Sequence, residues 1–409
     1  MNAMALIKEA EEKLAPIFAE MNEVSKRRTE DVISAFREHK MTEACLYPTT
    51  GYGYDDRGRE TIDSVYAEVF GCERAVVRHS IANGTHALTV GLFALLRPGD
   101  TMLSVTGGVY DTLEETIGVR GEGGRGTLRD FGIRYSEIPL SNKGDIDTDE
   151  LTSRLLTDKS IKVVYAQRSR GYGVRRALTS AELSHVYEVV HEFDGVYFVV
   201  DNCYGEFTEK TEPRADLLIG SLIKNPGGGL ALSGGYLAGS KKAVELASYR
   251  LTTPGLGDEV GATLGQNRNI IQGFFMAPHA VCQAKMTAAL AAYVFEAVGY
   301  EVSPRWDEGR SDIIETIKLG SPEALCAFCR GIQYGSPIDS FVTPEPWDMP
   351  GYGDQVIMAA GTFVSGASIE LSADGPLRPP YIAYMQGGLT YEAGRYGIKS
   401  ALESLQKGQ

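Results

Sequence analysis

Two polar residues that directly follow short apolar runs are the parts of this sequence best suited to chemistry. Asp201 follows the run at 196–200, and Lys224 follows the run at 217–223. Continuous apolar runs rich in β-branched residues are typical of buried strands. A lysine at the end of such a strand is costly to bury unless it is paired, or unless its amine is converted, for example to a Schiff base. Alternatively, the stem of Lys224 packs on the core while its ammonium group reaches water.

A loop of small residues could bind an anion. Asn83, Gly84 and Thr85 lie between an expected strand at 75–78 and an expected helix at 87–96. The backbone N–H groups of Gly84 and Thr85 can point at an anion there, with the positive end of the helix dipole behind them. Gly84 would equally suit a tight turn without a ligand. The loop lacks the downstream Gly-Lys-Ser/Thr of a P-loop, which argues against an NTPase.

Together these groups match the requirements of pyridoxal phosphate. Ligands of open parallel sheets bind at the carboxyl ends of the strands, where Asp201, Lys224 and the 83–86 loop are all expected. Pyridoxal phosphate needs a lysine for the Schiff base, a carboxylate that keeps the pyridine nitrogen protonated, and a helix N-terminus for the phosphate. Tyr110, just after an expected strand at 101–105, is the candidate for stacking on the ring. Considered singly, Tyr110 could also be an ordinary core or surface tyrosine.

The elements that position these residues alternate between strand and helix. Further expected elements are a strand at 162–166 and a helix at 180–193. This order predicts an α/β fold whose mostly parallel sheet has helices on both faces. We expect mainly helix from residue 240 to about 299, and then a smaller α+β domain with strand-like segments at 355–362 and 367–371.

The first part of the chain is expected to form a helical arm. Its apolar pattern suits two amphipathic helices, with Pro16 breaking or kinking the first. The predicted division is therefore an N-terminal arm at 1–50, a large cofactor-binding domain at 51–290, and a small α+β domain at 291–409.

Composition and charge narrow the class of protein. The 409 residues are 43% hydrophobic and 23% charged, as in ordinary globular proteins, and the net charge is -14. Such a charge argues against nucleic-acid or anionic-membrane partners. Neither an apolar run long enough to span a membrane nor a secretory signal is apparent, so we expect a cytoplasmic protein.

The cysteines and histidines indicate neither a disulfide scaffold nor a metal site. Six cysteines are too few and too scattered for a disulfide framework in a chain of this length. Cys326 and Cys329 form a Cys-x-x-Cys pair, but no second pair or histidine lies at metal-binding spacing, so we expect ordinary helix packing. The six histidines do not suggest a zinc site.

Several segments carry a resemblance to a known family. The phrases SLIKNPGGG, GYGYDDRGRETIDSVYAEVFG and QRSRGYGVRRAL resemble the aluminium-resistance or methionine γ-lyase-like branch of the cysteine/methionine-metabolism enzymes. These are cystathionine β-lyase-like, fold-type I enzymes that depend on pyridoxal phosphate. The resemblance covers the chain from about residue 48 to about residue 391.

The resemblance implies a role for each candidate residue. It makes Lys224 the aldimine lysine, Asp201 the partner of the pyridine nitrogen, and Tyr110 the stacking tyrosine. The phosphate ligands that the resemblance implies within the same chain are Ser221 and the loop of Asn83, Gly84 and Thr85. Tyr110 would also protonate the leaving group.

The resemblance also implies a homodimer or homotetramer with shared active sites. Family members bring a tyrosine and an arginine from the neighbouring subunit to the phosphate, which here would be Tyr54 and Arg57. The family spacing is Tyr-x-Arg, whereas two residues separate Tyr54 from Arg57 in this chain, and Arg59 is a competitor.

The implied reaction is β- or γ-elimination from an amino acid, with a sulfur-containing substrate expected. The substrate carboxylate requires the planar fork of an arginine. Arg378 lies where relatives keep that arginine, and Arg170 and Arg175 are rivals. Another fold-type I reaction (aminotransferase, aldolase or racemase) stays open, as does a non-catalytic, cofactor-binding stress protein.

Overall fold

A computed structural model describes residues 2–349 and 352–407, and its chain divides into two compact units. The central unit comprises Asp31–Leu222 and Ala231–Gln272, and the terminal unit comprises Met1–Glu30, Ile223–Leu230 and Gly273–Gln409. These units are groups of residues that contact one another and do not define domain boundaries. The domains at 1–50, 51–290 and 291–409 therefore remain a prediction.

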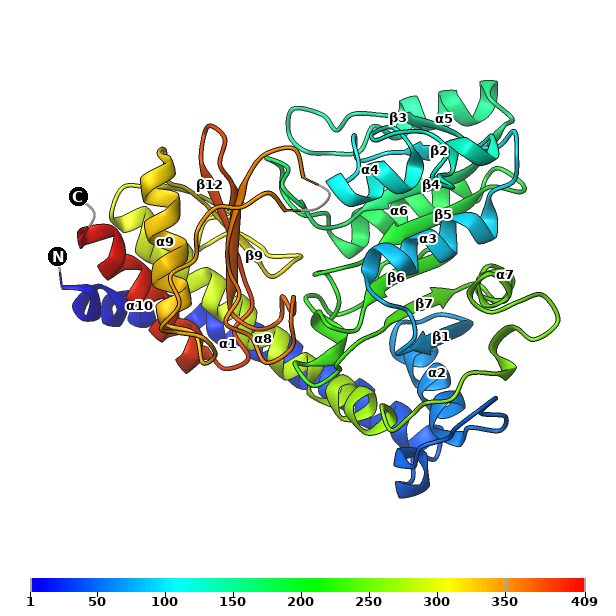
Figure 1. Cartoon of the computed structure of the whole chain (residues 1–409), viewed down its shortest axis with the longest axis horizontal. Coiled ribbons are helices and arrows are strands. Elements are labelled where there is room, and N and C mark those ends of the chain that lie inside the picture. Colours follow the sequence, from blue (N-terminus) through cyan, green and yellow to red (C-terminus); the bar gives the residue numbers. More distant parts are fainter. Residues whose placement is uncertain (1, 350–351, 408–409) are drawn as a thin grey trace. The chain divides into compact units, whose positions relative to one another are not determined.

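The central unit is built on a seven-stranded sheet in the order β1-β7-β6-β5-β4-β2-β3 (Figure 1). The pairs β3–β2, β2–β4, β4–β5 and β5–β6 are parallel, whereas β7 is antiparallel to both of its neighbours. The prediction of a mostly parallel sheet is therefore confirmed. The strands are β1 (Arg74–Arg78), β2 (Thr101–Ser104), β3 (Arg134–Glu137), β4 (Ile161–Gln167), β5 (Tyr197–Asp201), β6 (Leu217–Ser221) and β7 (Gly235–Gly239).

Helices cover both faces of this sheet. Apolar side chains of α3, α4 and α7 form one buried cluster with alternate residues of the strands, while α6 packs against β5 on the other face. The helices are α2 (Arg57–Val69), α3 (Gly84–Leu95), α4 (Asp111–Ile117), α5 (Thr148–Thr157), α6 (Ser180–Val190) and α7 (Lys241–Leu251).

Helix α6 begins with a capping box, in which Thr179 and Glu182 satisfy each other's backbone N–H groups. Burial raises the pKa of the Glu182 carboxyl group, but hydrogen bonds from Arg176 and Thr179 outweigh this effect and lower the pKa to about 2.

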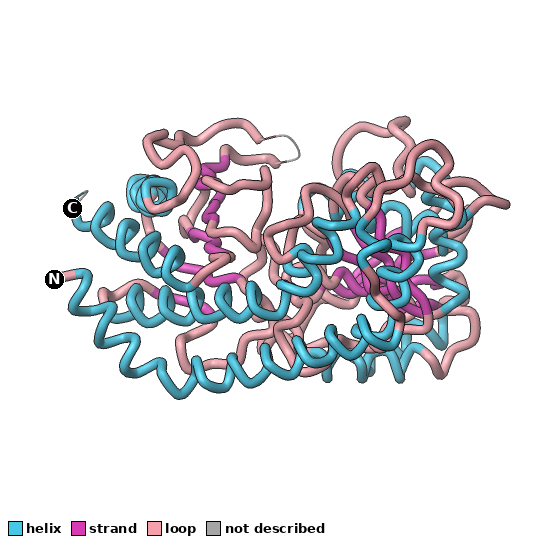
Figure 2. Tube along the Cα trace, turned by 90° about the horizontal axis from the view of Figure 1, so that it is seen from below, coloured by secondary structure: helices cyan, strands magenta, loops and turns pink. Residues whose placement is uncertain are grey.

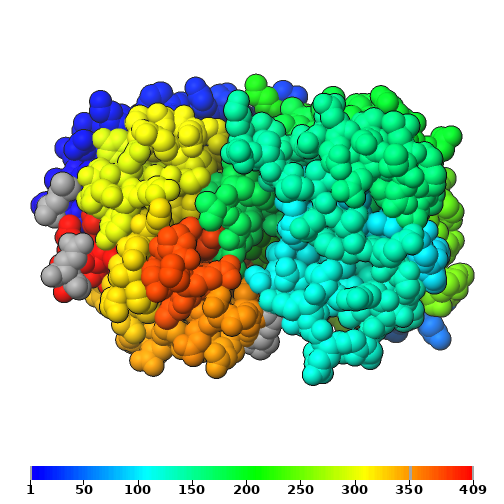
Figure 3. All heavy atoms as spheres, turned by 90° about the horizontal axis from the view of Figure 1, so that it is seen from above, coloured from blue at the N-terminus to red at the C-terminus, as the bar shows by residue number. Residues whose placement is uncertain are grey.

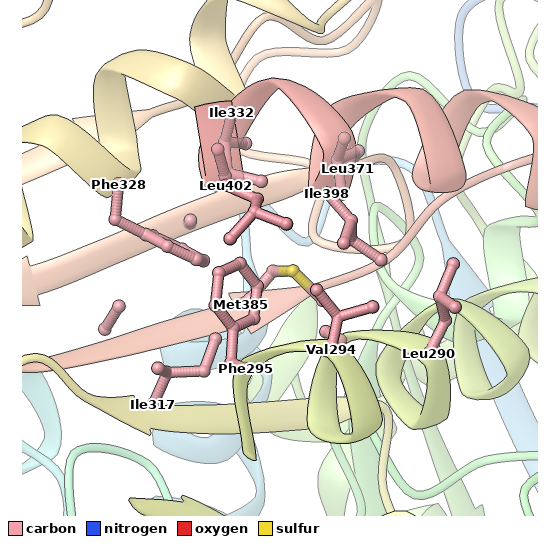
Figure 4. Packing of buried hydrophobic residues seen from close by; sticks show 14 of the residues in the cluster. Leu290, Val294, Phe295, Ile317, Phe328, Ile332, Leu371, Met385, Ile398 and Leu402 are labelled. Carbon is pink, nitrogen blue, oxygen red and sulfur yellow. The ribbon is translucent and has the colours of Figure 1, made fainter. Parts of the chain in front are cut away.

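The terminal unit contains a five-stranded antiparallel sheet in the order β10-β11-β12-β9-β8. Its core combines this sheet with α8, α9, α10 and the start of α1, and Figure 4 shows Met385, Phe295 and Leu402 meeting there. The elements are α1 (Ala3–Glu38), α8 (Asn267–Ala297), β8 (Glu301–Ser303), β9 (Ile314–Lys318), α9 (Pro322–Tyr334), β10 (Val356–Ala359), β11 (Ser372–Pro376), β12 (Ile382–Gln386) and α10 (Tyr391–Lys407). The Cys-x-x-Cys pair lies in α9, as expected.

The prediction of two N-terminal helices is wrong, because α1 is one continuous helix with Pro16 inside it. Pro16 lies on the exposed side of the helix, where the carbonyl group that loses its hydrogen bond can be hydrated. Buried residues before and after it, including Leu14 and Met21, hold both halves on the same core. Helix α8 runs beside α1 (Figure 2), and the Ser25 hydroxyl donates a hydrogen bond of 3.1 Å to the Pro278 carbonyl.

Two strand predictions also need correction. Strand β6 ends at Ser221, so Lys224 does not close the strand but precedes a short 3-10 helix, Asn225–Gly227. Residues 367–371 form no strand, and β11 begins only at residue 372. There the Glu370 carboxylate accepts hydrogen bonds from the backbone N–H groups of Phe363 and Val364, which folds the segment into a turn.

The described part of the chain contains no helix that is both long and apolar enough to cross a membrane. None of the six cysteines, all of which lie in the described part of the chain, forms a disulfide bond. Among the described residues, no group of His, Cys, Asp or Glu is arranged to hold a metal ion.

Candidate active site

The start of α3 and the end of β6 enclose a small cup that is a candidate anion site. Asn83 caps the helix, its side-chain oxygen accepting a hydrogen bond of 2.8 Å from the N–H of His86. Among the described residues, no group accepts from the N–H groups of Gly84 and Thr85. A Cβ atom on Gly84 would lie 3.5 Å from Cβ of Ser221, so the glycine opens a small space between the helix N-terminus and the strand end.

Asp201 lies at the end of β5, next to β6, and is 5% exposed. Its carboxylate accepts a hydrogen bond of 3.1 Å from the N–H of Cys203, which fixes the orientation of the side chain. The Cys203 sulfur would lie 3.4 Å from a Cβ atom on Gly84. The turn after β5 therefore reaches the Gly84 cup, and three of the predicted site residues share one edge of the sheet.

Tyr110 lies beside this cup. Its hydroxyl group is 3.0 Å from the Thr85 hydroxyl, which in turn is 3.2 Å from the Thr112 hydroxyl. Tyr110 is partly buried and precedes α4 as its N-cap. The structure thus brings the predicted stacking tyrosine to the predicted phosphate loop.

Gln167 is a residue of this edge that the sequence analysis missed. It ends β4 directly beside Asp201, with which it is paired across the strands. Its side-chain oxygen accepts a hydrogen bond of 3.2 Å from the N–H of Tyr110, and its amide group donates one of 3.0 Å to the Ser169 carbonyl. The signal was present in the sequence, since Gln167 ends an apolar strand just as Asp201 does.

Lys224 follows Ser221 by three residues, and its side chain is partly buried. The chain itself therefore limits the Cα–Cα distance from Ser221 to Lys224 to about 11 Å. The Gly228 backbone after it packs tightly in the terminal unit, where a Cβ atom would lie 2.3 Å from the Gly273 carbonyl oxygen. The segment that carries Lys224 is therefore held firmly at its glycine-rich end.

The turn with Tyr54 and Arg57 is exposed, whereas Arg59 is buried inside it. The Arg59 guanidinium donates hydrogen bonds to the carbonyl groups of Gly53 at 2.6 Å, Gly261 at 2.9 Å and Glu259 at 3.2 Å. Arg59 therefore holds the turn to a distant segment. Of the two arginines that the sequence left as competitors, only Arg57 has an exposed side chain.

Asp56 reinforces this arrangement from the start of α2. Its buried carboxylate accepts hydrogen bonds from the Thr49 hydroxyl, the Thr263 hydroxyl, the Asn267 amide and the Arg59 N–H. Burial raises the pKa of Asp56, but these hydrogen bonds outweigh it and the pKa is lowered overall.

The candidate arginines for a substrate carboxylate differ in environment. Arg170 is 3% exposed, and the residue after it adjoins Tyr110, since a Cβ atom on Gly171 would lie 3.7 Å from Cβ of Tyr110. Arg175 instead donates to the carbonyl groups of Gln167 and Ser169, the former at 2.7 Å.

Arg378 belongs to the turn between β11 and β12, which lies at the surface in orange-red in Figure 3. Its side chain is 51% exposed and forms an ion pair of 3.0 Å with Asp354.

Comparison with known proteins decides the family. The family model described as methionine gamma-lyase matches residues 3–406. The chain belongs to the methionine gamma-lyase family. A relative from Bacillus subtilis (strain 168), the uncharacterised protein YnbB, is 48% identical over 405 residues, which are 98% of this chain and 96% of the relative.

Solved structures of family members are closely similar. A carbon–sulfur lyase involved in aluminium resistance from Clostridium novyi NT is 47% identical, with a TM-score of 0.94 over 98% of this chain and 95% of that one. A protein from Clostridium acetobutylicum, provisionally named a cystathionine beta-lyase involved in aluminium resistance, is 43% identical, with a TM-score of 0.95 and the same coverage.

The fold itself is shared more widely. A pyridoxal-5'-phosphate dependent protein from Escherichia coli, YhfS, has a TM-score of 0.63 over 95% of this chain and 97% of its own at only 14% identity. The predicted fold-type I architecture is therefore confirmed, and so is the resemblance that the sequence motifs indicated.

Proposed function

We propose that this protein is a pyridoxal phosphate-dependent lyase that cleaves the carbon–sulfur bond of an amino acid by β- or γ-elimination. The observation that carries the proposal is the cup between α3 and β6, which lies beside a buried carboxylate at the end of β5. A family whose solved members include a named carbon–sulfur lyase supports the choice of reaction.

The residues present fit the cofactor. The N–H groups of Gly84 and Thr85 and the Ser221 hydroxyl suit a phosphate, and the space that the missing side chain of Gly84 leaves lets an oxygen approach them. The carboxylate of Asp201 suits a protonated pyridine nitrogen, and the ring of Tyr110 suits stacking. Asn83 contributes by fixing the start of α3.

Each proposed step assigns a proton to an atom of this chain. Bound pyridoxal phosphate supplies an electron sink for the carbanion at the substrate Cα. The Lys224 amine, which would hold the cofactor covalently at rest, is freed when the substrate amine takes its place and then removes the Cα proton, while Asp201 keeps the pyridine nitrogen protonated. The carbon–sulfur bond then breaks, and the Tyr110 hydroxyl gives its proton to the leaving sulfur.

Arg170 is the arginine that we propose for the substrate carboxylate, with Arg378 as the alternative. Its loop adjoins Tyr110 and is anchored through Ser169 to Gln167. Arg170→Lys keeps the charge but loses the planar fork, so KM for the amino acid should rise by about tenfold or more. The same change at Arg378 should leave KM unaltered, and the reverse result would transfer the role to Arg378.

Tyr54 and Arg57 are proposed to serve the phosphate of a second copy of the chain, in a homodimer or homotetramer. Their exposure on a turn that Arg59 holds in place suits contact with a partner. A mixing experiment tests this role. If Lys224→Ala and Arg57→Ala subunits are mixed, hybrid oligomers should regain active sites that neither parent has, whereas activity that never exceeds the sum of the parents contradicts sharing.

The central test combines cofactor trapping with a substrate panel. Borohydride should fix the cofactor on the wild-type chain and on the control Lys242→Ala, whose lysine is exposed, but not on Lys224→Ala. With a panel of sulfur amino acids, the wild-type protein should release thiol and ammonia together with a keto acid. Keto acid with amine transfer and no thiol would indicate an aminotransferase, and cofactor binding without any turnover would indicate a non-catalytic protein.

A further inference from the structure

A buried polar network lies behind Asp201, on the opposite face of the sheet. Side chains alternate along a strand, so Asp201 faces the α3 side with Val199, whereas Asn202 faces the other side. The Asn202 side chain is fully buried, and its oxygen accepts a hydrogen bond of 2.7 Å from Arg168. Its amide group donates to Glu212 at 3.1 Å and to the Tyr236 hydroxyl at 3.3 Å, so every polar group of this side chain is used.

Arg168 connects this network to the backbone of the site. Its guanidinium is fully buried and forms ion pairs with Glu212 at 3.1 Å and with Glu209 at 3.3 Å. The backbone N–H of Arg168 donates a hydrogen bond of 3.0 Å to the Asp201 carbonyl. One residue therefore holds both the backbone of Asp201 and the side chain of Asn202.

The turn that follows Asp201 is strained. Tyr204 and Phe207 have φ angles of 70° and 62°, in the left-handed region that non-glycine residues avoid. The network holds this turn, because Glu212 also accepts a hydrogen bond of 2.9 Å from the Phe207 N–H. Gly205 lies against Arg168, where a Cβ atom would come within 2.4 Å of the arginine side chain.

The beginning of the same turn fixes the orientation of the Asp201 carboxylate. The Asp201 side chain accepts from the Cys203 N–H, and Asn202 lies between these two residues in the chain. Any rotation of the backbone at Asn202 would therefore move the N–H that fixes the carboxylate. A strained turn keeps one conformation only where its surroundings determine it fully, as this network does.

We propose that Asn202, held by Arg168 and Glu212, is the positioning residue that aims the Asp201 carboxylate at the cofactor. This inference rests on the proposed function, in which Asp201 keeps the pyridine nitrogen protonated. Asn202 acts through Asp201 from the other face of the sheet and touches neither cofactor nor substrate.

Asn202→Leu tests the proposal, because leucine has the same branching and number of side-chain heavy atoms but no polar group, and both members of the Arg168–Glu212 pair are kept. Glu209→Gln is the matched control, since it removes the charge of the partly exposed partner of Arg168 without changing a contact of Asn202. Three quantities are measured: the dissociation constant of pyridoxal phosphate from the apoprotein, the visible absorption band of the bound cofactor, and the free energy of unfolding of the apoprotein.

We expect Asn202→Leu to raise the dissociation constant by about tenfold or more and to shift the band in the same direction as Asp201→Asn does. Glu209→Gln should leave both at wild-type values, even if the apoprotein is less stable. Glu212→Gln, which keeps its shape and its acceptor for Phe207, should shift the band in the same direction by a smaller amount.

The inference is overturned if Asn202→Leu and Glu212→Gln bind the cofactor with wild-type affinity and a wild-type band while Asp201→Asn does not. Failure of the proposed function has a different signature. In that case Asp201→Asn itself leaves the band unchanged, or the apoprotein binds no pyridoxal phosphate.

Discussion

Replacing Gly84 with alanine should change the stability of the apoprotein and its affinity for the cofactor in opposite directions. The backbone of Gly84 does not lie in the left-handed region, and the added Cβ atom would make ordinary contacts of 3.4 Å with Cys203 and 3.5 Å with Ser221. The fold therefore accommodates the methyl group. Because alanine restricts the unfolded chain more than glycine does, the apoprotein should be more stable by about 0.4–1 kcal/mol.

The cofactor should respond in the opposite way. The methyl group would occupy the space through which a phosphate oxygen approaches the N–H groups of Gly84 and Thr85. A hydrogen bond to a charged group contributes about 1.5–3 kcal/mol, so the loss of two of them costs about 3 kcal/mol or more. The dissociation constant of pyridoxal phosphate should therefore rise by about 100-fold or more.

The assay is an absorbance titration of the apoprotein with pyridoxal phosphate, together with urea unfolding of the apoprotein. Gly309→Ala is a suitable control, because no atom lies within 4 Å of its added Cβ and its backbone is not left-handed. It should change stability to a similar degree without affecting the cofactor. A Gly84→Ala apoprotein that unfolds more easily, or a dissociation constant within roughly threefold of wild type, would refute the reasoning about the cup.

Three further predictions concern neighbouring features. Arg59→Met should lower the free energy of unfolding by about 3 kcal/mol, because buried carbonyl groups lose a charged donor, whereas Arg57→Ala should change it by less than about 0.5 kcal/mol in the same urea experiment. The pKa of Glu182 is lowered to about 2 from 4.5, so its carboxylate stabilises the fold above pH 4.5 and this contribution is lost as the pH falls towards 2. Glu182→Gln should therefore destabilise the protein at pH 7, and the difference from wild type should vanish near pH 2 in urea titrations. Tyr110→Phe keeps the stacking ring, so kcat should fall by about tenfold or more while cofactor affinity changes by less than about threefold; equal losses in both would contradict a proton-transfer role.

Local pattern was enough to predict the sheet edge on which the candidate site lies. Asp201 follows an apolar strand, and Gly84 precedes an apolar helix. The carboxyl ends of parallel strands necessarily share one edge of the sheet. The convergence of these residues with Ser221 therefore follows from the alternation of strands and helices. The strand before Lys224 was predicted, but its end was placed too late, because β6 stops at Ser221, where its pairing with β7 stops.

Partners that are distant in sequence explain what could not be predicted. Arg59 and Arg57 look alike in the sequence, and only the carbonyl groups near residue 261 make the former a buried donor. The buried position of Arg168 could not be predicted from its neighbours in the sequence, because its partner Glu212 lies 44 residues away. At Pro16 a local signal predicted a break that does not occur. The tendency of proline to end a helix is overridden by the core that both halves of α1 share.

The clamp formed by Asp56 and Arg59 has a consequence for the order in which the chain acquires its structure during synthesis. Its long-range partners lie at 259–267, some 200 residues later in the sequence. While the ribosome is still making the central strands, the turn with Tyr54 has only local contacts, such as those of Arg59 with Gly53 and of Asp56 with Thr49, and both charges remain accessible to water. The surface that we propose for contact with a second copy is thus completed only after most of the chain has emerged, so any assembly of the proposed kind could begin only once the sheet behind it exists.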